Sequence, residues 1–130
     1  MNYKDILNDF FDKRVLNCGE LIKLVNLAEV TEKHKIVLRN LLDINKGEVV
    51  SYSDFAKKCG FDIQTRNIAS LIGKNPFPVI IPCHRVIRKS GEIGNFIFGS
   101  GIKKELLDFD SGKITDISTG TKNTIYNFYS

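Results

Sequence analysis

The residues best suited to chemistry in this sequence are the adjacent pair Cys83 and His84. A cysteine reacts as its thiolate, and an ordinary pKa of about 8.5 leaves only a few per cent of it ionised at neutral pH. A neighbouring histidine can take the thiol proton, directly or through one water molecule. The pair therefore predicts a nucleophile, Cys83, with His84 as its base. An isolated Cys-His pair is more often a buried free cysteine beside a surface histidine, so the surrounding residues must decide.

Those surroundings are unusual. Pro76, Pro78 and Pro82 each fix φ and remove a backbone donor, so an interior helix is not expected here. The apolar residues 79–81 between them predict a short buried strand that delivers Cys83 in one orientation, as a nucleophile requires. Successive side chains of an extended segment point to opposite faces, so we expect the proton path to His84 to pass through a water molecule.

The segment NPFPVIIPCHRV, residues 75–86, closely resembles the active-site segment of the O6-alkylguanine-DNA alkyltransferases, also called methylated-DNA–protein-cysteine methyltransferases. In that family the cysteine of PCHRV takes the alkyl group from a damaged guanine, irreversibly and once. A motif of this length and order is far more specific than Cys-His alone. The resemblance implies that Cys83 is the alkyl acceptor and that no cofactor is needed, because the protein itself is the acceptor.

Composition agrees with a single domain that contains one folded core, with 130 residues of which 42% are hydrophobic. We find no apolar run long enough to span a bilayer and no signal peptide, and we expect an intracellular protein, in the cytoplasm of a prokaryote or the nucleus of a eukaryote. The three cysteines have neither disulfide nor metal spacing, and we predict no metal site. From residue 63 to 91 there is no acid but there are five bases, which favours a polyanion nearby.

The predicted fold is mainly α with a few short β-strands, and contains a helix-turn-helix that resembles the winged-helix-like catalytic domain of the alkyltransferases. We divide the chain into a short helical N-terminal extension (1–30), the catalytic domain (31–110) and a polar C-terminal tail (111–130). Within the tail, a linker or a late strand around 125–128 both remain open.

The helix-turn-helix is predicted from two short helices. Ser51 and Asp54 form a capping box at the first helix, and Asp62 is expected to cap a second helix over residues 63–72. Arg66 falls near the start of that second helix, where recognition residues usually lie. An ordinary helical hairpin is the alternative.

The resemblance extends to GEVVSYSDFAKKCG, residues 47–60. It implies that Tyr52 rotates the target phosphate and hydrogen-bonds guanine N3, and that Arg66 enters the base stack from the minor groove. It also implies that Asn75 is a hinge, and that Cys83 and Val86 offer main-chain carbonyls to the guanine amino group. Base flipping is required because an O6-alkyl carbon is out of reach in a stacked duplex. The predicted DNA-facing residues are Ser51, Tyr52, Gln64, Thr65, Arg66, Asn67, Ser70 and Arg85.

After the cysteine, GEIGNFIFG and the helix that follows it also resemble the family, with departures. Phe96 stands in place of a tyrosine, and Ile97 and Phe98 stand in place of small residues. Asp110 replaces the glutamate that orients the histidine, and we expect it to orient His84. We predict that Phe98 lies against the pocket, so that the site accepts methyl and reacts poorly with benzyl. The predicted pocket residues are Asn75, Val86, Phe96, Ile97 and Phe98.

The predicted function is therefore repair of O6-alkylguanine in double-stranded DNA by transfer of the alkyl group to Cys83. His84 acts as base, Asp110 orients it, and Tyr52 assists the leaving purine. The protein is expected to act as a monomer, from the minor groove, without a membrane. Two alternatives remain: a catalytically silent relative that binds alkylated DNA, against which Cys83 argues, and a helix-turn-helix regulator, which would not need PCHRV.

Overall fold

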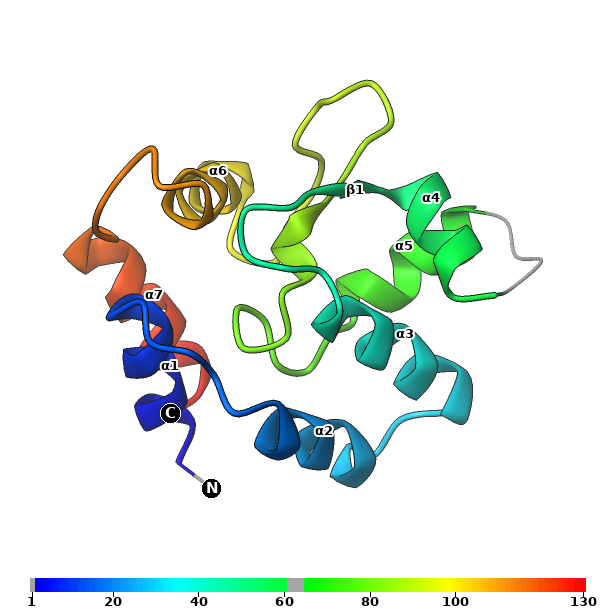
Figure 1. Ribbon diagram of the computed structural model, residues 1–130, viewed down its shortest axis with the longest axis horizontal. Coiled ribbons are helices and arrows are strands. Elements are labelled where there is room, and N and C mark those ends of the chain that lie inside the picture. Colours follow the sequence, from blue (N-terminus) through cyan, green and yellow to red (C-terminus); the bar gives the residue numbers. More distant parts are fainter. Residues whose placement is uncertain (1, 61–64) are drawn as a thin grey trace.

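The structure is a computed structural model that describes residues 2–60 and 65–130, without the side chains of residues 65 and 66. This part of the chain is mainly helical with one short parallel sheet, which confirms the predicted fold class (Figure 1). Its elements are α1 (Tyr3–Phe11), α2 (Cys18–Leu27), α3 (Glu32–Leu42), β1 (Val50–Ser51), α4 (Tyr52–Lys58), α5 (Thr65–Gly73), the 3-10 turn η1 (Cys83–Arg85), β2 (Val86–Ile87), α6 (Ser100–Asp110) and α7 (Thr119–Phe128).

Helix starts follow the capping residues. The side-chain oxygens of Asn2, Asn17, Thr31, Ser51 and Ser118 each accept a hydrogen bond from a backbone N–H in the first turn of the helix that follows. A cap of this kind satisfies one of the donors that a helix start leaves unpaired. The N-cap positions predicted at Thr31 and Ser51 are confirmed.

The helix-turn-helix consists of α4 and α5, which pack against each other and lie beside α3 (Figure 1). Phe55 and Ile68, one from each helix, are fully buried in a first hydrophobic core shared with α2 and α3. The cap predicted at Asp62 and the predicted start of the second helix at Ile63 lie outside the described residues.

Residues 111–130 do not form the polar tail or late strand that we predicted. α7 lies beside α1 at the left of Figure 1, and the ring of Tyr126 packs edge-on to that of Phe11. Ile117, Thr121 and Ile125 are buried at a spacing of four residues, so the inward stripe is only one residue wide. Most of the other residues of the segment are polar, and this masked the helical period.

The two-stranded sheet pairs Val50 with Val86 and Ser51 with Ile87 in parallel register. It joins the residue that caps α4 to the segment directly after Cys83. The short sheet thus fixes the helix-turn-helix relative to the reactive cysteine.

The segment before Cys83 lies between two hydrophobic cores. Ile81 and Cys83 belong to the first core, whereas Val79 and Ile80 belong to a second core formed with α1, α6 and α7. The predicted strand over 79–81 is wrong: the chain turns here, and Val79 has φ of 74°. The two cores bury opposite sides of residues 79–81, so every apolar residue of this run is buried. A fully buried run has no alternation of apolar and polar residues, and therefore no periodicity that distinguishes a strand from a turn. None of the described helices is both long and apolar enough to cross a membrane.

Candidate active site

Cys83 lies at a cavity of about 420 Å³, and only 6% of the residue is exposed. It begins η1 rather than ending an extended strand. The cavity is formed by the helix-turn-helix, the active-site segment and the loop before α6. Its lining residues are Tyr52, Ala69, Ile72, Gly73, Asn75, Pro78, Cys83, Arg88, Asn95, Phe96 and Ile97.

The buried side chain of Asn75 fixes the segment that carries Cys83. Its Nδ2 donates to the Ile81 carbonyl at 2.9 Å, and its Oδ1 accepts from the Phe77 N–H at 2.9 Å. Asn75 lies two residues after the end of α5, between the helix-turn-helix and the segment that carries Cys83. Burial raises the pKa of the Cys83 thiol, while a hydrogen bond from Asn75 and the charge of Lys103 act in the opposite direction. The resting cysteine is therefore a neutral thiol.

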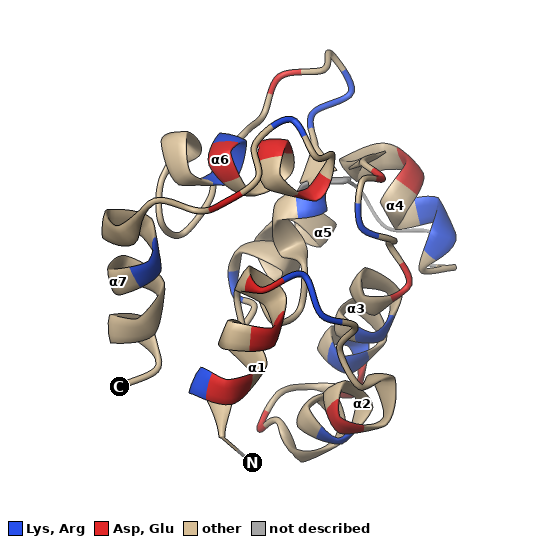
Figure 2. Ribbon diagram, turned by 60° about the vertical axis from the view of Figure 1, so that its left-hand side comes forward, with Lys and Arg blue, Asp and Glu red and all other residues tan. Residues whose placement is uncertain are grey.

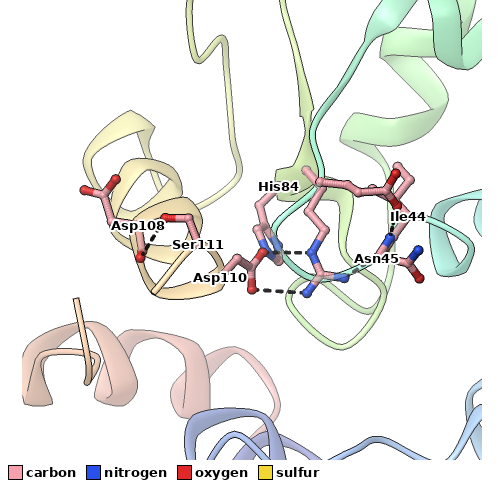
Figure 3. Close-up of polar contacts among 8 residues, drawn as sticks. Ile44, Asn45, His84, Asp108, Asp110 and Ser111 are labelled. Carbon is pink, nitrogen blue, oxygen red and sulfur yellow. Dashed lines mark hydrogen bonds and ion pairs between the residues drawn. The ribbon is translucent and has the colours of Figure 1, made fainter. Parts of the chain in front are cut away.

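His84 is fully buried, and its Nε2 lies 2.8 Å from Asp110 Oδ2 on α6, as Figure 3 shows. Burial alone would raise the pKa of Asp110, but hydrogen bonds from His84 and Arg85 lower it to about 2. An ionised carboxylate only accepts, so Nε2 carries the proton. Burial lowers the pKa of His84, which keeps the ring neutral. Its other nitrogen, Nδ1, is buried without a hydrogen-bond partner and is an acceptor for a proton.

Arg85 differs from the prediction that it faces DNA. Its Nε and one terminal nitrogen donate to the two oxygens of Asp110 at 2.7 and 3.1 Å, and its other terminal nitrogen donates to the Ile44 carbonyl at 2.9 Å. The side chain is only 13% exposed. This bidentate pair holds the carboxylate in place for His84, so the guanidinium is not offered to a phosphate.

Lys103 is a site residue that we did not predict. It is 1% exposed, and its Nζ donates to the carbonyls of Val86 at 2.7 Å and Asn95 at 3.3 Å and lies 5.7 Å from the centre of the Tyr52 ring. Burial lowers its pKa to about 8, partly offset by the Cys83 charge. Lys103 lies on the same face of α6 as Leu106, one turn later, and Asp110, two turns later. That spacing could have shown that Lys103 is buried. The Val86 carbonyl proposed for guanine thus already accepts one hydrogen bond.

The loop before α6 only partly agrees with prediction. Phe96 lines the cavity, with its ring edge-on to His84 at 6.4 Å, and the half-exposed Ile97 lines it too. Phe98 turns away, and its ring packs edge-on against Phe96 and Phe128, at 5.6 Å from each. The prediction that Phe98 narrows the pocket is wrong, because α7 supplies the apolar partner that we did not anticipate.

The predicted DNA face is described in part. Tyr52 lines the cavity, and burial raises its pKa, so its hydroxyl stays protonated. Asn67 and Ser70 are exposed one turn apart on α5. Ser51 is half-buried and occupied as the N-cap of α4. Gln64 and the side chains of Thr65 and Arg66 lie outside the described residues.

The three cysteines are free thiols in different surroundings. Cys18 is exposed, Cys59 is buried, and burial raises the pKa of Cys59 to about 11. No group of three His, Cys, Asp or Glu side chains in the described ranges could hold a metal ion. Among these three thiols, Cys83 lines the cavity beside Tyr52 and precedes the His84–Asp110 pair.

Comparison with known proteins agrees with this arrangement. Residues 32–112 match the family model described as 6-O-methylguanine DNA methyltransferase, DNA binding domain. The chain belongs to this family. The protein named methylated-DNA–protein-cysteine methyltransferase in Methanothermobacter thermautotrophicus is 35% identical to it, over 68% of this chain and 49% of that protein. The protein of the same name in Pyrobaculum aerophilum is 34% identical, over 80% of this chain and 66% of that protein. The chain thus spans about half to two thirds of these methyltransferases.

Solved methyltransferase structures have the same fold. A crystal structure of Mycobacterium tuberculosis OGT in complex with DNA superposes with a TM-score of 0.70 at 28% identity, over 85% of this chain and 66% of that one. The O6-methylguanine-DNA methyltransferase of Pyrococcus kodakaraensis gives 0.63 at 28% identity, over 82% and 61%. These matches support the helix-turn-helix architecture of the family in this chain.

Proposed function

We propose that this protein repairs O6-alkylguanine in double-stranded DNA by transferring the alkyl group irreversibly to Cys83. The observation that carries the proposal is the position of Cys83. It lies at a cavity beside the helix-turn-helix and immediately precedes a buried histidine whose ring is held by a carboxylate. Membership of the methyltransferase family supports the substrate.

The reaction balances with the groups present. Cys83 Sγ forms a bond to the alkyl carbon while the bond from that carbon to O6 breaks, and the electron pair stays on the purine. The thiol proton passes to His84 Nδ1 through a water molecule, and the purine gains a proton in turn. Tyr52 has the protonated hydroxyl needed to donate to N3 of the leaving purine. The positive charge of Lys103 favours the thiolate as it forms.

Asp110 keeps His84 in the tautomer that can accept a proton, and Arg85 keeps Asp110 ionised. The alkylated base must leave the stack to reach Cys83, so we propose that the protein flips it from the minor groove, as a monomer and without a cofactor. We further propose that the exposed residues Asn67 and Ser70 of α5 face DNA, and that the protein acts in the compartment that holds DNA.

Intact-mass spectrometry after mixing with a duplex that carries one O6-methylguanine tests the proposal. We expect one added methyl group per molecule, located on Cys83, and no further turnover. Cys83→Ser should bind the duplex without an adduct, because a hydroxyl has no accessible anion at neutral pH. Cys59→Ser is the matched control and should still be methylated. Tight binding by the wild type without an adduct would instead indicate a non-catalytic sensor.

A further inference from the structure

Arg88 is the cation at the cavity whose role the proposed reaction leaves open. We propose that Arg88 binds a phosphate group that flanks the flipped nucleotide and so holds the alkylated base against Cys83. This inference rests on the proposed function, since it concerns the same cavity. Arg88 follows β2 directly, lines the cavity together with Tyr52 and Cys83, and its side chain is 52% exposed.

The position of the Arg88 side chain is set by its neighbours. Gly94 has φ of 80°, and a Cβ built there would lie 3.5 Å from Arg88 Cγ, 3.6 Å from Arg88 Nε and 3.7 Å from Tyr52 Cε2. The Arg88 stem and the Tyr52 ring therefore both lie against this glycine. Backbone hydrogen bonds from the Arg88 N–H to Glu92 O and from the Gly91 N–H to Arg88 O close the loop. The guanidinium is thus held beside the tyrosine.

The charges around Arg88 favour an anion. Its described ion pair is with Glu92 at 3.7 Å, between two side chains that are 52% and 71% exposed, and such a pair contributes little. Among the described residues, those that line the cavity include no aspartate or glutamate. The buried cation Lys103 lies nearby, close enough to Arg88 for the two charges to interact. Figure 2 shows basic residues on one limb of the loop at the top of the view and an acid on the other limb. Arg85, three residues earlier, is by contrast fully paired inside the protein.

The shape of a nucleotide explains why the anion is a phosphate. The alkyl carbon must reach Cys83, which is nearly buried, so O6 points inward and the sugar and its two phosphates stay at the exposed side of the cavity. Arg88 is half exposed and lies on that side. A planar guanidinium can bind two phosphate oxygens at once, and that geometry fixes position as well as charge.

A linkage-replacement experiment tests this. Duplexes with one O6-methylguanine are prepared with a neutral methylphosphonate in place of the 5′ phosphate, the 3′ phosphate, or a phosphate several nucleotides away. Single-turnover methylation rates are measured for the wild type and Arg88→Ala. We expect Arg88→Ala to lower the rate about tenfold on natural DNA and to reduce the slope of log binding constant against log salt by about 1.

The decisive result is the coupling between protein and DNA changes. One of the two flanking methylphosphonates should slow the wild type about tenfold but slow Arg88→Ala little further, and the distant one should act equally on both. Arg88→Lys should recover part of the rate. Lys89→Ala, the matched control on the adjacent exposed residue, should show no such coupling.

Other outcomes would overturn the inference. If the effects of Arg88→Ala and of both flanking methylphosphonates simply multiply, Arg88 contacts neither phosphate. The same coupling in Lys89→Ala would mean that the surface attracts DNA without a specific contact. Absence of methylation by the wild type on natural DNA would instead refute the proposed function, and that result is distinct from both.

Discussion

The aromatic contact between Phe98 and Phe128 should control which alkyl groups the site accepts. Phe98 lies outside the cavity because its ring packs against Phe128 of α7 as well as against Phe96. We therefore expect the wild type to react with O6-benzylguanine in DNA. Phe128→Ala should remove this restraint and let Phe98 turn toward the cavity, where it would compete with a bulky alkyl group.

The magnitude follows from the contacts. An edge-on aromatic pair contributes about 0.5–1.5 kcal/mol beyond the burial of its area. Phe128 is 41% exposed, so its truncation should cost much less folding stability than truncation of a core phenylalanine. Loss of about 1 kcal/mol from the outward position of Phe98 shifts its population roughly fivefold. We expect the ratio of benzyl to methyl transfer to fall, by at most about that factor, because only the outward population of Phe98 leaves room for the benzyl group.

The assay measures single-turnover rates with two duplexes that differ only in the alkyl group. Methyl transfer serves as the internal control for folding and DNA binding. The double variant Phe98→Gly, Phe128→Ala should recover the wild-type ratio, because no ring is left to turn inward. An unchanged ratio in Phe128→Ala would refute the reasoning. So would a wild type that rejects benzyl until Phe98→Gly is introduced, since Phe98 would then already face the cavity.

Three further predictions concern the buried network and the packing of α7. Asp110→Asn should lower the methylation rate strongly and destabilise the fold by about 3–5 kcal/mol in urea unfolding, because it leaves Arg85 buried without its counter-charge. Asp108→Asn, which changes a surface ion pair, is the control. Equal effects of the two substitutions would contradict the role of Asp110. His34 is buried on α3 with its pKa lowered by burial, so the folded state takes up a proton less readily than the unfolded chain, and stability should fall as pH drops below about 6.5. His34→Gln should flatten that slope in unfolding measured from pH 7.5 to 5.5, and an identical slope would show that other groups cause it. Tyr129→Phe removes the hydrogen bond from the hydroxyl to the Pro78 carbonyl at 2.6 Å, which should cost about 1 kcal/mol and lower the melting temperature by a few degrees; an unchanged melting temperature would mean that the contact contributes nothing.

Local sequence features predicted the elements whose formation depends on local chemistry. Thr31 and Ser51 cap helices as expected, because a cap needs only its own side chain and the next turn. The contact between His84 and Asp110 was also anticipated, although only through the family resemblance, since 26 residues separate the two.

Long-range contacts decided what the sequence could not show. Arg85 and Arg88 lie in the same basic segment, yet one is bound by Asp110 from α6 and the other is half exposed. No local pattern distinguishes them, because the partner of Arg85 comes from a distant helix. Phe98 turned outward for the same reason, since its partner Phe128 belongs to a helix with an apolar stripe too narrow to recognise.

The order in which these contacts form during synthesis has a consequence for the nascent chain. The Pro78 carbonyl is bound by Tyr129, which is 51 residues later, so at roughly 5–20 residues per second the ribosome needs about 3–10 seconds to supply it. During that interval the second core, which holds Val79 and Ile80 just before Cys83, is incomplete because α6 and α7 have not yet packed. Until that core closes, the segment that carries the thiol is not held in place, and the thiol is more open to oxidants and electrophiles than in the folded protein. If the nucleophile is used only once, as proposed above, wasteful modification is most damaging before folding is finished, and rapid docking of α6 and α7 shortens that period.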